Sequence, residues 1–186
     1  MRKTKPGQGR ATPAPTPADM EEGDRASLAG LTALFLAANV FIMGHPFDDE
    51  PVRDEAAAHD LIGEAGGMLA SVGLATMPLS SSQAVAAMGV SPPGCPLLGL
   101  GVTTASLTQP DRVVVRLSQM VRLSRAPEVE IAVPTWQITG ICALGEWRET
   151  ASALLRDFVC AYLSANPQVH SRPAAPARGF PGIGRG

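Results

Sequence analysis

Alternating apolar and polar positions mark a long strand over residues 112–125, RVVVRLSQMVRLSR. Its odd positions are nearly all apolar and its even positions mostly polar, so one face is expected to pack inward and the other to meet water. The segment LLGLGVTTASL precedes it, and the turn formers of TQPD join the two into a hairpin. The next strand, EVEIAVPTWQITG, carries Pro134 near its middle. Proline donates no hydrogen bond, which predicts an edge strand or a bulge.

Two segments have the 3.6-residue period of amphipathic helices, at about 54–72 and 144–163. The first has acidic residues at its positive N-terminal end and is followed by Gly73 and a short strand, LATM. The second ends before a proline at position 167, which cannot continue a helix. The large aromatic side chains are expected to be structural anchors of the core: Trp136, Trp147, Phe158 and Tyr162.

The uncharged segment 28–44 has two interpretations. Its run of apolar residues suits a strand buried on both faces. It is slightly shorter than the roughly 20 residues of a spanning helix, and a membrane anchor is the alternative. About two dozen polar residues precede it, several of them acidic, which is atypical of a secretory signal. The strand is favoured, and the anchor stays open.

These elements follow the order strand, helix, strand, three-stranded antiparallel meander and helix. They predict an α+β fold, a two-layer sandwich in which a mostly antiparallel sheet of about four to five strands carries two amphipathic helices on one face. Residues 1–26 and 168–186 are rich in proline, glycine and charge and are expected to be disordered tails. Residues 27–167 then form a single domain.

The net charge of −2 argues against a protein held to nucleic acid by its overall charge. The three cysteines stand at wide, unpatterned spacings, which fits neither a disulfide framework nor a zinc site. Free buried thiols are favoured, and one bridge remains open.

Four arginines fall in the long strand without any acid between them. A sheet face that binds single-stranded RNA carries aromatic side chains for base stacking, and this face has none. A solvated face or a protein interface is therefore favoured over nucleic acid. Acids gather in residues 48–64, and such a two-sided charge distribution can orient a partner. The predicted interaction surface comprises Arg112, Arg116, Arg122, Arg125, Asp48, Asp49 and Glu50.

No group of residues predicts a catalytic or metal site. HPFDDE brings His45 near three acids but lacks the alternating spacing of a calcium loop, so it is interpreted as an acidic approach to a helix N-terminus. Serines 80–82 lack a nucleophile elbow and are explained by helix capping. Cys95 is the cysteine expected to be most exposed, with no motif that lowers its pKa. No cofactor or metal is expected.

Four segments carry a resemblance: ASVGLATM, PLLGLGVTTAS with the following arginine strand, PTWQITG, and LLRDFVCAYLSANP. Together they are similar to a family of small, uncharacterised bacterial α+β proteins, over about residues 31–167. The resemblance implies a fold and, because many such proteins begin with an export signal, an envelope location. It implies no reaction, and this chain departs from the pattern in its polar, proline-rich N-terminus. The matching positions are Gly73, Leu74, Thr135, Trp136, Phe158, Tyr162, Asn166 and Pro167.

Together these features predict a non-catalytic accessory or structural protein that binds another protein, in the cytoplasm or associated with the cell envelope. One alternative is an envelope protein anchored by residues 28–44. Another is a domain that binds a small anionic ligand on the arginine-bearing sheet face.

Overall fold

The computed structural model describes residues 22–43, 51–79, 95–104 and 110–171. The predictions for His45, for Asp48, Asp49 and Glu50 and for serines 80–82 lie outside these ranges. The elements in chain order are α1 (Glu22–Leu28), β1 (Ala33–Met43), β2 (Pro51–Arg53), α2 (Glu55–Ser71), β3 (Ala75–Pro78), β4 (Leu97–Thr104), β5 (Asp111–Leu123), β6 (Ala126–Cys142), α4 (Trp147–Ala165) and the 3-10 turn η2 (Pro167–Ser171).

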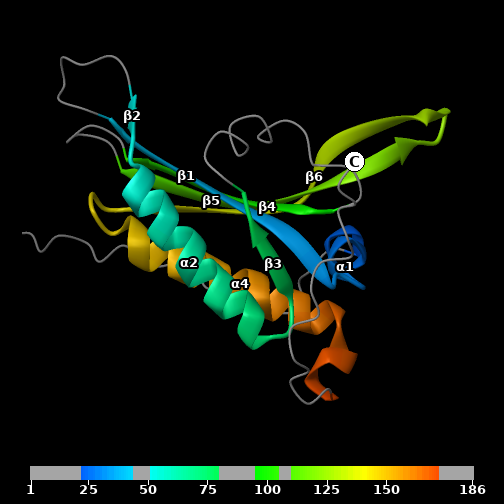
Figure 1. The fold of residues 1–186 in the computed structure, drawn as a ribbon. Coiled ribbons are helices and arrows are strands. Elements are labelled where there is room, and N and C mark those ends of the chain that lie inside the picture. The colour runs from blue at the N-terminus through cyan, green and yellow to red at the C-terminus, as the bar shows by residue number, and fades with distance from the viewer. Residues whose placement is uncertain (1–21, 44–50, 80–94, 105–109, 172–186) are drawn as a thin grey trace, which may run out of the picture.

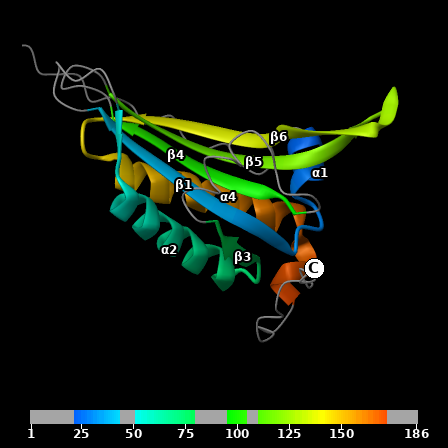
Figure 2. The ribbon, with the colours of Figure 1, turned by 45° about the horizontal axis from the view of Figure 1, so that its top comes forward.

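One mixed sheet organises the chain. Five strands follow the order β2-β1-β4-β5-β6, and β3 pairs with the first residues of β1. The pairs of β1 with β3 and with β4 are parallel, whereas the other pairs are antiparallel. Helices α2 and α4 lie side by side against one face of the sheet (Figures 1 and 2). The predicted α+β two-layer class, mostly antiparallel, is therefore confirmed.

Strand β1 is buried on both faces, which explains why its sequence is apolar throughout. Leu34, Leu36 and Val40 belong to the main core under the helices, while Phe35 and Ala37 pack with Leu97 on the opposite face. The strand interpretation of this segment is confirmed. Within the described ranges, no helix combines the length and the apolar character needed to cross a membrane.

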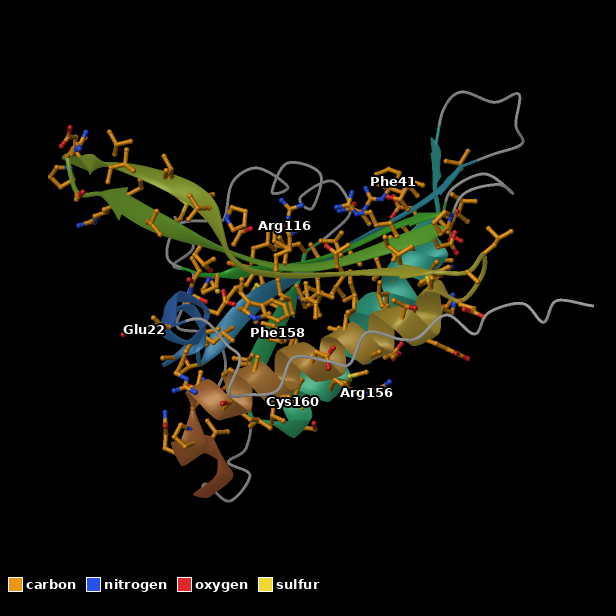
Figure 3. The ribbon with its side chains drawn as sticks, turned by 180° about the vertical axis from the view of Figure 1, so that it is seen from behind. Glu22, Phe41, Arg116, Arg156, Phe158 and Cys160 are labelled. Atoms are coloured by element: carbon orange, nitrogen blue, oxygen red, sulfur yellow. The ribbon has the colours of Figure 1, made fainter. Side chains whose placement is uncertain are left out.

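The main core lies between the sheet and the two long helices. Asp54 caps α2, because its side chain accepts a hydrogen bond from Ala57 N at 2.9 Å. Phe158 of α4 is fully buried and meets Trp136 of β6 edge to face, with ring centroids 5.1 Å apart. Figure 3 shows Phe158 between the helices and the sheet, with Arg116 and Phe41 on the sheet's other side. All four aromatic residues predicted as anchors are buried.

Helix α4 lies very close to the sheet at Gly140 of β6. A β-carbon added there would lie 2.6 Å from Thr150 Cγ2 and 3.3 Å from Leu154 Cδ1. Gly140 does not have a positive φ, so the reason for glycine here is space rather than backbone conformation.

Helix α1 begins at Glu22, so the folded part starts earlier than the sequence indicated. The side chains of Asn166 and Tyr162, near the end of α4, bind the backbone at the end of α1 and just after it, and we call these two side chains the clamp. Asn166 accepts a hydrogen bond from Gly30 N at 2.7 Å and donates to Leu28 O at 2.8 Å and to Tyr162 O at 2.9 Å. Tyr162 donates its hydroxyl to Leu31 O at 3.2 Å. The clamp thus joins the two ends of the described chain.

Burial gives Tyr162 a measurable pH signature. Burial raises the pKa of its hydroxyl, and Tyr162 is the single tyrosine of the chain. The unfolded chain releases this proton near pH 10, whereas the folded chain retains it to higher pH. The contribution of Tyr162 to the free energy of unfolding is therefore fully present below that pH and is lost as pH rises through the folded pKa.

We expect the ultraviolet absorbance of the phenolate to appear at higher pH in the native protein than in denaturant. Tyr162→Phe should remove the absorbance change altogether, which assigns it. Equal midpoints in the native and denatured protein would contradict the buried clamp.

Candidate functional site

Residues 119–133 form a two-stranded arm that leaves the body of the protein. The pairing of β4 with β5 stops at Leu97 and Ser118, whereas β5 and β6 remain paired as far as Leu123 and Ala126. Figures 1 and 2 show the arm projecting beyond both long helices. Helix α1 lies at its base, where Gln119 Nε2 donates to Ser27 O at 3.0 Å. A two-stranded ribbon buries little surface by itself, so the faces of the arm remain available for contacts.

A bulge marks the place where the arm leaves the body. Leu117 pairs with Trp136 and Ser118 pairs with Pro134, which leaves Thr135 as an extra residue in β6. Because β6 is also the last strand of the sheet, both parts of the expectation for Pro134, an edge and a bulge, are confirmed. The extra residue shifts the alternation of β6, so that residue 133 rather than 134 continues the face of Trp136.

The apolar face of the sheet continues along the arm. Val121 pairs with Ile131, and both lie on the side that carries the core in the body. Three large side chains of the arm are substantially exposed: Leu123 at 39%, Val129 at 39% and Ile131 at 38%. Contiguous exposed apolar residues of this kind typically mark interaction sites. By alternation along the two strands, Val121, Ile131 and Val133 share this face. Leu123 and Val129 follow them at the tip, beyond a second register irregularity between Arg122 and Leu123, and we include both exposed side chains in what we call the arm face.

The charges of the arm are balanced. Arg122 Nε lies 2.8 Å from Glu130 Oε1 on the face opposite the arm face, and Arg125 and Glu128 are exposed near the tip. Two arginines are thus matched by two glutamates. The arm therefore has no net charge to attract a partner, and its apolar face is its distinguishing feature.

The predicted arginine surface is divided by the structure. Arg112 and Arg116 are exposed on the body of the sheet, whereas Arg122 and Arg125 lie on the arm. At about 3.4 Å per residue, Arg112 and Arg122 are roughly 34 Å apart along β5. The four side chains therefore offer separate positive charges rather than one compact basic patch.

The side chains with potential for chemistry are dispersed. In the part of the chain that the structure describes, no three His, Cys, Asp or Glu residues are grouped so that they could hold a metal ion. The three cysteines are free, and Cys160, rather than Cys95, is the exposed one. Burial raises the pKa of the Cys95 thiol, and a hydrogen bond with the Phe35 backbone opposes this in part. A raised pKa leaves little thiolate at neutral pH.

The sequence pattern predicts the strands of the arm but not its exposed face. The feature that indicates an arm is the difference in strand length: β4 has 8 residues, whereas β5 has 13 and β6 has 17. The excess residues of β5 and β6 can pair only with each other, so they must extend beyond the rest of the sheet.

The comparisons with known proteins add one distant structural likeness. No model of a known protein family matches the chain, and no curated protein matches it. A solved structure described as "Crystal structure of uncharacterized protein" is similar over 72% of this chain and 86% of that chain. The two share 14% sequence identity, with a TM-score of 0.27.

Proposed function

We propose that the protein is a non-catalytic protein-binding domain whose arm face docks on an apolar surface of another protein. One observation carries the proposal: the arm face continues the core face of the sheet into a region where neither long helix covers it. In the body, the same face is buried by α2 and α4. A partner would supply the equivalent cover for the arm.

The size of the arm face limits what it can contribute. Burying the exposed part of Leu123, Val129 and Ile131 contributes about 1 kcal/mol each, whereas a micromolar complex needs about 8 kcal/mol. The partner must therefore make further contacts. The outer edge of β6 has no neighbouring strand among those described, so its backbone groups can pair with an added strand. The bulge at Thr135 and Pro134, which has no N–H to donate, interrupt this edge, so an added strand can pair with β6 on one side of them but not continuously across them.

Two aspartate substitutions in the same strand test the proposal. Ile131 lies on the arm face, whereas Ile141 is outside the arm and is even more exposed, at 72%. We expect the tagged wild-type chain and Ile141→Asp to elute from size exclusion of cell extracts as part of a larger complex. Ile131→Asp should elute as the free chain, with unchanged circular dichroism because the side chain is already partly in water.

Two results would contradict the proposal. The first is a wild-type chain that elutes at its own mass in extracts of the producing cells. The second is a complex that Ile131→Asp and Ile141→Asp retain to the same extent.

A further inference from the structure

Two short strands pair with different parts of the outer edge of β1 and leave a gap between them. β3 pairs with Ala33–Leu36 and β2 with Phe41–Met43, so residues 37–40 face neither strand. Leu36 O accepts from Leu79 N, and Val40 O accepts from Asp54 N, each at 2.9 Å. Ala38 lies between these two bonds, and its carbonyl oxygen is 3.5 Å from Arg53 Nη2. A side chain thus contacts β1 where a neighbouring strand would otherwise continue.

A cavity of about 470 Å³ occupies this interval, between β1, α2 and the two short strands. We call it the edge cavity. Pockets for small molecules in proteins span about 300–1,000 Å³, so its size suits a small ligand. Its walls are mainly apolar, with Leu36, Ile62 and Leu79 among them. Its charged and ionisable residues are Arg53, Glu55 and His59, which come from β2 and the first turns of α2.

Two glycines of α2 keep the edge cavity open. A β-carbon added at Gly63 would meet nothing within 4 Å, and one at Gly66 would make an ordinary contact with Thr76 Oγ1 at 3.6 Å. Neither glycine has a positive φ. Glycine within a helix costs about 1 kcal/mol relative to alanine, and neither close packing nor backbone conformation requires it at these two positions. Their effect is to leave room beside the apolar wall.

Arg53 places a largely buried positive group in this wall. Its side chain is 17% exposed, and its Nε lies 3.2 Å from Glu55 Oε1. The Glu55 side chain is 55% exposed, so this ion pair borders water. A guanidinium has five N–H donors, so it can donate hydrogen bonds to an incoming carboxylate while it keeps its other contacts. The exposed His59 lies one turn further along α2 and adds a second nitrogen donor.

We propose that the edge cavity binds a small amphipathic carboxylate, with its apolar chain between β1 and α2 and its carboxylate at Arg53 and His59. This site is separate from the arm face and does not depend on the proposed protein-binding function. The chemistry follows from the apolar walls together with the Arg53 guanidinium and the His59 imidazole in the lining, and the bound carboxylate shares Arg53 with Glu55.

Thermal unfolding of the full chain with octanoate as the probe tests the proposal. Octanoate should raise the melting temperature by a few degrees once it is in excess over its dissociation constant. Acetate has the carboxylate without the chain, and octylammonium has the chain with the opposite charge. Neither should produce that rise. No rise with octanoate, or an equal rise with octylammonium, would overturn the proposal.

Two glycine substitutions on α2 locate the site. Gly66→Leu fills the edge cavity and should abolish the rise caused by octanoate. Gly67→Ala is the matched control, because Gly67 is exposed and does not line the cavity. It should retain the rise on a slightly more stable background. If Gly66→Leu does not fold, Gly63→Met serves the same purpose. An undiminished rise in a folded, cavity-filled variant would place octanoate elsewhere and overturn the proposal.

Discussion

Replacing Asn166 by aspartate is expected to lower the free energy of unfolding by about 3 kcal/mol or more. The wild-type amide donates to two carbonyl oxygens, Leu28 O and Tyr162 O, in a site where Asn166 is 1% exposed. A carboxylate has the same shape but cannot donate. Both oxygens would lose their donor and face a negative charge, and each unsatisfied buried group costs about 1–3 kcal/mol.

Urea unfolding of Asn166→Asp at neutral pH measures this loss. Burial raises the pKa of the introduced carboxyl, so its protonation at lower pH restores one donor, and the deficit should shrink as pH falls. Gln168→Glu is the matched control, because it makes the same amide-to-acid change at an exposed position nearby. Equal stabilities of the two variants would show that the clamp contributes little.

Gly140→Ala is expected to lower the free energy of unfolding by about 1–3 kcal/mol, the usual effect of an overpacked core. The added β-carbon would lie 2.6 Å from Thr150 Cγ2, well inside van der Waals contact, so α4 must move away from β6. Leu154 Cδ1 at 3.3 Å limits the direction of that movement.

A double-mutant cycle attributes the Gly140 effect to this contact. Thr150→Ser deletes the methyl group that the new β-carbon would meet, so the double variant should lose less stability than the two single changes added together. Gly99→Ala provides the control within the same sheet. A β-carbon there would lie 3.8 Å from Arg116 O, and we expect little change in stability. Additive losses in the cycle would contradict the close approach of α4 to β6.

Periodicity predicts the elements of this fold well because it reports which face of each element is buried. The alternation in residues 112–125 predicts that Val113, Val115 and Leu117 face inward, and all three are buried. Proline at position 134 predicts both an edge and a bulge, since it cannot donate to a neighbouring strand. These are local properties, and local sequence is enough to determine them.

Features that depend on pairing between distant segments escape such reasoning. The arm exists because β4 pairs with only part of β5, and its apolar face depends on the one-residue shift at Thr135. The edge cavity depends on how β2 and β3 divide the edge of β1. Asn166 is recognisable as a helix end, yet its bond to Gly30 joins residues 136 positions apart. No pattern within a single segment contains that information.

The binding role of the arm is the central claim, and site-specific photo-crosslinking in the producing cells tests it most directly. A photoreactive residue at Val129 lies on the arm face, whereas one at Ala56 lies on the exposed side of α2 and serves as the control. The arm position should yield one discrete protein adduct that Ile131→Asp abolishes, and the control position should not yield it. No adduct at Val129, or the same adduct from both positions, would contradict a protein-binding role for the arm.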